Sequence, residues 1–287
     1  MSLIGVDVGG THIKIGVVQG NLEVCWRDER AAPDTAQGIV QAVYDMVQLA
    51  WRKAPGARVG VSFAGTWDGE GCVTANQLGL KRAPVKRMLQ DAFGMALPLE
   101  NDAVCALLAE HRYGALQGCE TAILLTLGTG IGGGVLVQGQ PLRGHRGLHG
   151  ELGHMITHLN GLACSCGQNG CWEQYAAARA LGHMAAPLTT GELIACVRDG
   201  VHVDLWQRYI QELVGGIQSL MMVFMPEVLA IGGGLSNAGD MVADSIREAV
   251  ELTSAFRTYC PFLRIVPAHF RNDAGIIGAA ALAKQAC

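Results

Sequence analysis

The sequence lacks the features that would direct it to a nucleic acid or a membrane. Only 16% of its 287 residues are charged, the formal net charge is -4, and the lysines and arginines form no stripe. A protein that binds nucleic acid through the phosphates carries a basic face. The longest apolar runs, at residues 220–225 and 276–283, are far too short to span a bilayer. We therefore expect no nucleic acid and no membrane among its partners.

Low-complexity segments, charge blocks and Ser/Pro-rich linkers are missing as well. The N-terminus has no basic region of the kind that opens a secretory signal, so we expect a cytoplasmic protein with reduced cysteines. Half of the residues are apolar, which suits a well-buried α/β protein. A length of 287 residues is comfortable for two domains.

Residues 144–173 contain the densest group of potential ligands. G-E-L-G-H at 150–154 is followed by C-S-C-G-Q-N-G-C-W-E at 164–173. Zn²⁺ favours nitrogen and sulfur donors, and one His with three Cys closes a tetrahedral structural site. The candidate ligands are His154, Cys164, Cys166 and Cys171. Ordinary core cysteines and disulfides are the alternatives. A metal here would hold Glu151 and Glu173 at a fixed separation, which makes their carboxylates candidate functional groups of the site.

Two segments show a strand, a glycine-rich turn and a second strand. In the first, residues 3–8 and 13–18 flank Gly9-Gly10-Thr11; in the second, a strand from 121 leads into G-T-G-I-G-G-G and V-L-V. Bare backbone amides in such a turn can hold phosphate oxygens, although a plain hairpin turn fits the same pattern. The second segment repeats the first and indicates two related halves.

A third glycine turn, Gly232-Gly233-Gly234, follows a predicted strand over 228–231. Together the three turns look like the walls of a nucleotide cleft. The sequence contains no G-x-x-x-x-G-K-[ST], and no G-x-G-x-x-G opens a helix after a strand, which excludes P-loop and Rossmann sites.

Asn101-Asp102 lies between a predicted strand at 96–100 and a predicted helix at 103–113. Ligands of α/β sheets are met at the carboxyl ends of strands. An Asp at this junction is more commonly an N-cap, and the local pattern favours that reading. The other patterns predict helices over 35–53, 84–93, 172–184, 190–197, 205–224, 238–252 and 272–286, and strands over 58–64, 72–75 and 263–267.

These segments together resemble the ROK family (repressor, ORF, kinase) of sugar kinases and sugar-responsive repressors, within the actin/hexokinase/Hsp70 fold group. The most specific match is to the family's zinc and sugar-binding signature, at 150–154 and 164–173. Four further matches are D-V-G-G-T-H-I-K at 7–14, E-N-D-A at 100–103, L-G-T-G-I-G-G-G at 127–134 and I-G-G-G-L at 231–235. They are similar to the first phosphate motif, the catalytic motif, the second phosphate motif and the adenosine turn. N-D-A-G-I-I-G-A-A at 272–280 is similar to the closing helix.

The resemblance implies a two-domain, actin-like ATPase (ribonuclease H-like) α/β fold with an interdomain cleft. One domain would comprise residues 1–115 and 272–287, with the first phosphate motif and the catalytic motif. The other would comprise residues 116–271, with the second phosphate motif, the zinc knuckle and the adenosine turn. The family also suggests a homodimer.

The activity implied is ATP-dependent phosphorylation of a hexose or N-acetylhexosamine at a terminal hydroxyl, with ATP, Mg²⁺ and structural Zn²⁺. Asp102 would be the general base. The sugar hydroxyls would be bound by Gly65, Asn76, Asn101, Glu151, His154 and Glu173. MgATP would be bound by Asp7, Gly9, Gly10, Thr11, Lys14, Gly128, Thr129, Gly130, Gly132, Gly133, Gly232, Gly233 and Gly234.

A non-catalytic, sugar-sensing regulator of the same family is the main alternative function. Family repressors carry an N-terminal helix-turn-helix, which this sequence lacks, and Asp102 and both phosphate motifs are present here. We therefore expect a kinase. Among its possible sugars, glucose and N-acetylmannosamine come first, before fructose, allose and N-acetylglucosamine. The segments near Asn76 and at 64–71 depart from the family pattern at the sugar rim.

Overall fold

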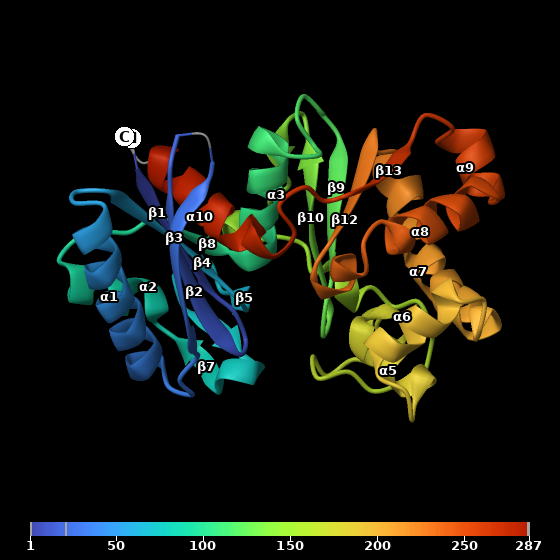
Figure 1. The fold of residues 1–287 in the computed structure, drawn as a ribbon, viewed down its shortest axis with the longest axis horizontal. Helices are drawn as coiled ribbons and strands as arrows, with labels where there is room; N and C mark the ends of the chain where they lie inside the picture. Colours follow the sequence, from blue (N-terminus) through green and yellow to red (C-terminus); the bar gives the residue numbers. More distant parts are fainter. Residues whose placement is uncertain (1, 21, 286–287) are drawn as a thin grey trace. The chain divides into compact units, whose positions relative to one another are not determined.

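A computed structural model describes residues 2–20 and 22–285 (Figure 1). Its contacts divide the chain into two compact units. The first unit comprises Met1–Ala109, Arg143–His149 and Asp273–Cys287, and the second comprises Glu110–Leu142 and Gly150–Asn272. The first boundary between the units lies between Ala109 and Glu110, inside helix α3 (Asp102–Tyr113). The boundary predicted from the sequence lies between residues 115 and 116. The segment Arg143–His149, expected in the other domain, belongs to the first unit by its contacts, and there Arg143 and Arg146 pair with Glu100 and Glu70.

The first unit contains a five-stranded sheet of order β3-β2-β1-β4-β8 and a three-stranded sheet of order β5-β6-β7. Its strands are β1 (Leu3–Val8), β2 (His12–Val18), β3 (Val24–Ala31), β4 (Arg58–Phe63), β5 (Thr66–Trp67), β6 (Val73–Ala75), β7 (Leu80–Ala83) and β8 (Leu99–Asn101). Its helices are α1 (Ala36–Lys53), α2 (Val85–Phe93), the start of α3 and α10 (Ala274–Gln285). Short 3₁₀ turns are η1 (Asn76–Leu78), η2 (His145–Gly147) and η5 (Arg271–Asp273), which leads into α10.

Helices α1 and α10 cover opposite faces of the larger sheet, as the blue and red helices of this unit show (Figure 1). Successive side chains of a strand point to opposite faces. Ile4, Val6 and Val8 accordingly join the core that contains α1. On the other face, a Cβ at Gly5 would lie 1.9 Å from the Ile276 carbonyl oxygen. The prediction that the small-residue helix packs closely on another element is thereby confirmed.

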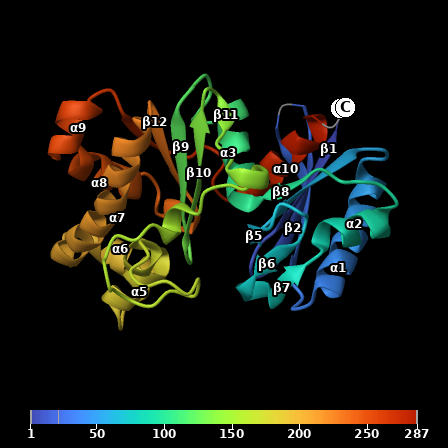
Figure 2. The same ribbon diagram turned by 180° about the vertical axis from the view of Figure 1, so that it is seen from behind.

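The second unit has its own five-stranded sheet, of order β11-β10-β9-β12-β13. The strands are β9 (Ala122–Leu127), β10 (Ile131–Val137), β11 (Gln140–Pro141), β12 (Val228–Gly232) and β13 (Arg264–Pro267). The helices are α4 (Glu173–Ala176), α5 (Ala178–Ala185), α6 (Thr190–Arg198), α7 (Val203–Phe224), α8 (Met241–Glu251) and α9 (Ser254–Tyr259), with 3₁₀ turns η3 (Leu152–His154) and η4 (Gly234–Ala238). Figure 2 shows α7 and α8 side by side along this sheet.

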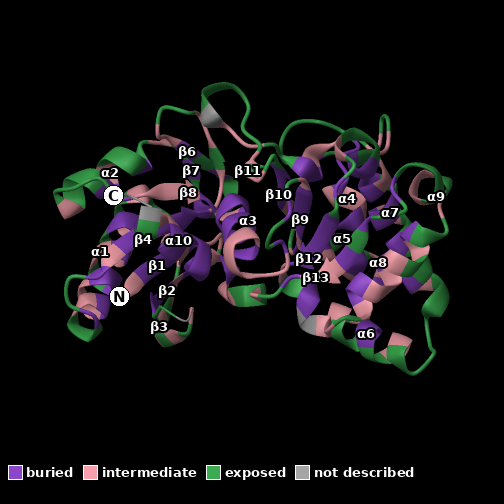
Figure 3. Ribbon diagram, turned by 90° about the horizontal axis from the view of Figure 1, so that it is seen from above, coloured by how far each residue is buried: buried purple, intermediate pink, exposed green. Residues whose placement is uncertain are grey.

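The two large sheets have the same topology. In each, the first two strands form an antiparallel hairpin, and the third strand extends it on the outer side of the second. A later strand, β4 or β12, then pairs in parallel with the first strand of the hairpin, and β8 or β13 pairs in parallel with that later strand. The repeat predicted from the two strand–glycine–strand segments is therefore confirmed. Buried residues concentrate on the strands of both sheets, as Figure 3 shows.

Several elements differ from the sequence prediction. The helix expected over residues 172–184 is broken into α4 and α5, because the Ala178 amide donates to the Gly128 carbonyl oxygen (2.8 Å). Strand β3 was not predicted, since its residues alternate between half-buried and exposed and include four charges. Helix α9 was missed as well. The predicted turn residue Asn21 and the predicted helix end at Ala286 lie outside the described residues. Across the described chain, none of the helices has the length and apolar character needed to cross a membrane.

Trp172 anchors the core of the second unit. Its ring is fully buried, and its Nε1 donates to the carbonyl oxygen of Glu212 in α7 (2.8 Å). Gly216 lies under the ring: a Cβ at that position would be 2.1 Å from Trp172 Cε2. Gly215, the preceding residue of the same helix, has open space at its Cβ position.

These neighbours form a matched pair for mutation. Gly216→Ala should lower the free energy of unfolding by about 1–3 kcal/mol, since the added methyl overpacks the core against Trp172. Gly215→Ala should raise it by about 0.5–1 kcal/mol, because Ala favours a helix interior over Gly. Chemical denaturation of both variants checks this. Equal effects of the two substitutions would contradict the close contact.

Candidate functional site

The carboxylate of Asp7 is held at the end of β1 by two neighbours. Ser62 of β4, opposite Asp7 in the parallel ladder, donates its hydroxyl to Asp7 Oδ1 (2.7 Å). Gly275 leaves room on the other side, since a Cβ there would lie 2.4 Å from Asp7 Cγ. Burial raises the pKa of the Asp7 carboxyl, while the Ser62 hydrogen bond and the charge of Lys14 lower it. The side chain is thus fixed in one orientation.

The first glycine turn joins β1 to β2. The Gly9 amide donates to the His12 carbonyl oxygen (2.9 Å), and the Thr11 hydroxyl lies 3.0 Å from His12 Nδ1. The side chain of Gln77 covers Gly10, where a Cβ would lie 2.0 Å from Gln77 Oε1. A larger residue at position 10 would therefore have to displace the end of the Gln77 side chain. One hairpin, made of β1, the glycine turn and β2, therefore carries all the predicted ATP-binding residues of this unit: Asp7, Gly9, Gly10, Thr11 and Lys14.

Asn101, rather than Asp102, caps helix α3. Its Oδ1 accepts the amides of Ala103 (2.9 Å) and Val104 (3.2 Å), and its side chain is buried. Asp102 is the first residue of the helix, and its Oδ1 also accepts the Ala103 amide (2.9 Å). The local reading of Asp102 as the N-cap is therefore wrong by one position. The shift leaves the Asp102 carboxylate at the positive end of a helix, where a negative charge is stabilised.

Three of the predicted sugar-binding residues lie near one another in the first unit. Asn101 Nδ2 donates to the carbonyl oxygen of Gly65 (3.2 Å). Gly65 has a φ of 125° and lies against strand β6, since a Cβ there would be 2.8 Å from the Thr74 carbonyl oxygen. Asn76 follows β6 directly and opens η1, with an exposed side chain. Asn101 thus links the loop after β4 to the start of α3.

In the second unit the other two glycine turns are neighbours. Gly128 donates its amide to the Gly130 carbonyl oxygen (3.0 Å), closing the turn that contains Thr129 between β9 and β10. Gly233 has a φ of 84°, and a Cβ there would lie 2.5 Å from the amide nitrogen of Leu127. Gly232 ends β12, and Gly234 opens η4 with open space around its Cβ position. Because β9 and β12 run parallel, both turns lie at the same edge of the sheet.

Gly132 and Gly133 were predicted in the glycine turn but belong to strand β10. They pair with Thr126 and Leu125 of β9. A Cβ at Gly133 would lie 2.5 Å from the Leu124 carbonyl oxygen. The lack of a side chain at Gly133 therefore serves sheet packing, and the turn itself is Gly128-Thr129-Gly130. A role of Gly132 and Gly133 in binding ATP stays a prediction.

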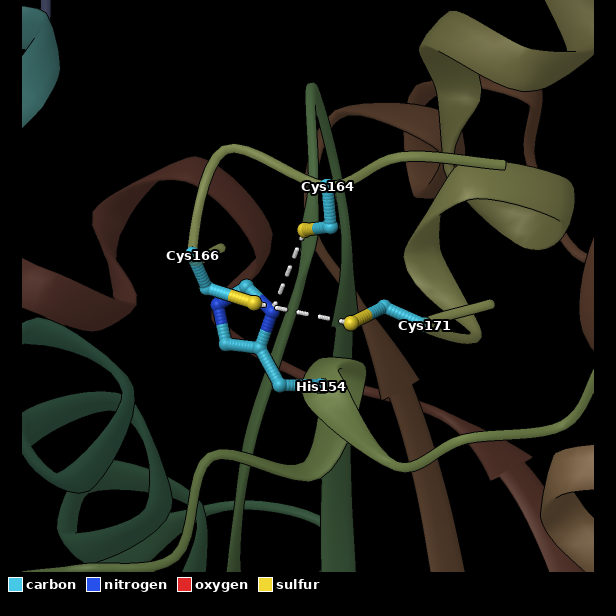
Figure 4. A group of neighbouring side chains, drawn as sticks. All are labelled: His154, Cys164, Cys166 and Cys171. Carbon is cyan, nitrogen blue, oxygen red and sulfur yellow. Dashed lines mark hydrogen bonds between the residues drawn. The ribbon is translucent and has the colours of Figure 1, made fainter. Parts of the chain in front are cut away.

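His154, Cys164, Cys166 and Cys171 converge on one point. Their ligand atoms all lie within 4.8 Å of one another (Figure 4). His154 Nδ1 lies 3.6 Å from Cys164 Sγ, and Cys166 Sγ lies 3.6 Å from Cys171 Sγ. His154 ends η3, and the three thiols come from the loop before α4. The group that the sequence spacing predicted is brought together by the fold.

The geometry fits a tetrahedral cation. With metal–sulfur distances of about 2.3 Å, the edges of a tetrahedron of thiolates are about 3.8 Å. The separation of 3.6 Å between Cys166 Sγ and Cys171 Sγ is close to this value. The edge from His154 Nδ1 to Cys164 Sγ, also 3.6 Å, suits the shorter metal–nitrogen distance of about 2.0–2.1 Å. Burial and the neighbouring thiols raise the pKa of Cys171 to about 12, so the metal-free group holds that proton. A bound cation would displace it, because a coordinating thiol is deprotonated.

Glu173 connects the thiol cluster to the second glycine turn. Its Oε1 accepts a hydrogen bond from Cys164 Sγ (3.3 Å) and lies 3.9 Å from His154 Nδ1. A Cβ at Gly130 would lie only 2.6 Å from Glu173 Oε2. Glu151 is exposed, and its carbonyl oxygen accepts the His154 amide (3.0 Å). In the second unit the predicted phosphate, sugar and metal residues therefore form one connected group.

Two side chains of these groups were not predicted. Ser62 is fully buried, and its hydroxyl within the apolar run of β4 is a signal that could have identified it. Gln174 donates from Nε2 to Cys164 Sγ (3.4 Å) and to Glu173 Oε1 (3.3 Å). Its only signal was its position next to Glu173.

Comparisons with known proteins identify the class. The chain is an α/β protein whose sheets and helices match solved ROK kinases. A glucokinase from Streptomyces griseus in complex with glucose and AMPPNP has 32% identity and a TM-score of 0.86, covering 99% of this chain and 100% of that one. The ROK hexokinase from Thermus thermophilus has 34% identity and a TM-score of 0.84, covering 99% and 98%.

Sequence comparison agrees. The glucokinase of Streptomyces coelicolor is 32% identical over 308 residues, which cover 98% of this chain and 97% of that enzyme. The sequence profile of the ROK family matches residues 3–286. This chain belongs to the ROK family.

Proposed function

We propose that the protein is a sugar kinase that transfers the γ-phosphate of ATP to the terminal hydroxyl of a hexose or N-acetylhexosamine. Two relatives that cover nearly the whole chain are glucokinases, which makes glucose the first candidate. The expected two-domain, actin-like organisation is part of the proposal, and the shared topology of the two sheets supports it. The homodimer and the cytoplasmic location stay predictions.

The observation that carries the proposal is the shared edge of strands β1, β4 and β8. These strands run parallel, so their carboxyl ends meet, bringing Asp7, Ser62 and Asn101 to one edge of the sheet. Ligands of α/β sheets bind at such edges. Asp102 follows directly, at the first turn of α3. A phosphoryl acceptor bound there would meet a carboxylate base.

Phosphoryl transfer requires little covalent chemistry from the protein. Asp102 would take the proton from the attacking hydroxyl, while glycine-turn amides position and stabilise the phosphates. Mg²⁺ would neutralise charge on the phosphate oxygens, with Asp7 as its candidate anchor. Glu151, Glu173 and Asn101 would accept or donate hydrogen bonds to sugar hydroxyls. His154 would bind the metal ion of the thiol cluster through Nδ1, which lies 3.6 Å from Cys164 Sγ, and Nε2 would be left for a sugar hydroxyl.

We also propose that the cluster holds a structural zinc ion. Four protein ligands leave no open coordination position, so the ion would support the fold and not act on substrate. Gln174 and the Glu173 carboxylate surround it as hydrogen-bonding neighbours. The ion would thereby fix the orientation of Glu173.

Purified protein should contain about one zinc ion per chain by elemental analysis. Cys166→Ser should remove the metal and lower the unfolding midpoint, since metal-binding free energy contributes to folding. Cys25→Ser is the matched control, an exposed thiol outside the cluster, and should change neither quantity. Metal-free protein with an unchanged midpoint in Cys166→Ser would refute the zinc proposal.

A coupled assay of ADP release with MgATP, run over hexoses and N-acetylhexosamines, tests the proposed function. We expect one sugar to give the highest kcat/KM, and glucose is the candidate. Silence across the panel, with sugar binding still visible as a thermal shift, would favour the sugar-sensing regulator instead.

Asp102→Asn should lower kcat by about 10²–10⁴, the range supplied by general base catalysis. Sugar affinity by calorimetry should stay within a few-fold, because Asn keeps the size of the side chain at the helix start. The control is Asp91→Asn, since Asp91 is exposed and pairs only loosely with Arg87 (3.8 Å). Normal turnover in Asp102→Asn would overturn the assignment of the base.

A further inference from the structure

The segment Arg143–His149, called here the strap, is a short part of the chain that leaves the second unit and returns to it. Both flanking residues, Leu142 and Gly150, belong to the second unit, whereas the strap itself belongs to the first. It is attached there by two arginines. None of its residues had a role in the sequence prediction, and the proposed function does not use them.

The outer attachment is exposed. Arg146 Nη1 lies 3.3 Å from Glu70 Oε1, and Arg82 Nη2 lies 2.7 Å from Glu70 Oε2. Gly69 permits the approach: its φ is 77°, and a Cβ there would lie 2.6 Å from Arg146 Cβ. Both side chains of the Arg146–Glu70 pair are 55% exposed, so solvent screens it and its contribution is small.

The inner attachment is much less accessible. Arg143 Nη2 pairs with Glu100 Oε2, and only 16% of the Glu100 side chain is exposed. The other oxygen, Oε1, accepts the amide of Asn101 (2.8 Å). The Glu100 carboxylate is therefore fixed between the strap and the backbone that leads into Asp102.

The surroundings of Glu100 are acidic. Burial and the charges of Glu100, Asp7 and Asp102 all raise the pKa of the buried Cys105 thiol. Glu100 also lies opposite Ser62 in the sheet, and Ser62 donates its hydroxyl to Asp7, so these two carboxylates are near neighbours. Arg143 itself is 38% exposed, so the pair is only partly shielded, but removing the cation leaves the less exposed Glu100 carboxylate without its partner.

We propose that Arg143 is a positioning residue for Asp102, which acts by neutralising Glu100 and holding it against the Asn101 backbone. The inference rests on the proposed kinase function. Without Arg143, the Glu100 charge would repel the anionic phosphate that approaches Asp102, and the backbone before Asp102 would lose a fixed contact. The strap therefore serves turnover more than sugar binding.

The test compares Arg143→Gln, Glu100→Gln and the double variant, with the best sugar of the panel. Arg143→Gln should lower kcat about tenfold, equivalent to 1.36 kcal/mol in the barrier, while calorimetric sugar affinity stays within about threefold. The kcat of the double variant should return to within about threefold of that of Glu100→Gln, because the neutral amide at position 100 carries no charge for a cation to offset. Arg146→Gln is the matched control from the same strap and should retain wild-type kcat.

Arg143→Lys keeps the charge and should retain most of kcat, so it replaces Arg143→Gln should that variant fail to fold. Wild-type kcat in Arg143→Gln would overturn the proposal. Glu100→Gln should itself retain kcat within about threefold of wild type, and a double variant that is as slow as Arg143→Gln beside such a Glu100→Gln would overturn the proposal too, since Arg143 would then act on the substrate itself. Inactive wild-type protein on every sugar would instead refute the proposed kinase function, which separates the two failures.

Discussion

Parallel pairing next to a hairpin is the constraint on which the candidate site depends. In each unit the first strand of the hairpin also pairs in parallel with a later strand, β1 with β4 and β9 with β12, so strand ends that are far apart in sequence meet at one edge. This edge gathers Asp7, Ser62 and Asn101 in the first sheet and two glycine turns in the second. Side chains placed at strand ends are held by the hydrogen bonds of the whole ladder, which suits a reaction that depends on positioning.

Close approach is the second common feature. Gly275 leaves room for the carboxylate of Asp7, Gly130 for that of Glu173, and Gly69 for the strap at Arg146. In each case a Cβ would fall well inside van der Waals contact. At Gly275 and Gly69 the neighbour cannot easily move, because Asp7 is held by Ser62 and Arg146 is met at its own Cβ. At Gly130 the neighbour is the end of the Glu173 side chain, which would have to shift. Glycines in this chain thus set how near a charged group can come to the backbone.

Periodicity and spacing predicted most elements of both units, including the repeated half, because amphipathic helices and buried strands are local patterns. The predictions failed where distant contacts decided the local structure. The break at Ala177 depends on the Gly128 carbonyl oxygen, and β3 is an edge strand with charged residues. Asn101 could have been identified as the cap, since its amide oxygen reaches the same helix start as an Asp side chain would.

The sequence by itself determined the groups whose members are close along the chain: the thiols around the zinc candidate, the two short glycine turns and the Asn-Asp pair. Their spacing constrains geometry because few backbone conformations separate them. The tertiary structure alone decided that Ser62 orients Asp7, that Glu173 reaches both Cys164 and the Gly130 turn, and that the strap joins the first unit. These contacts depend on strand register and on the packing of distant segments, which no local pattern encodes.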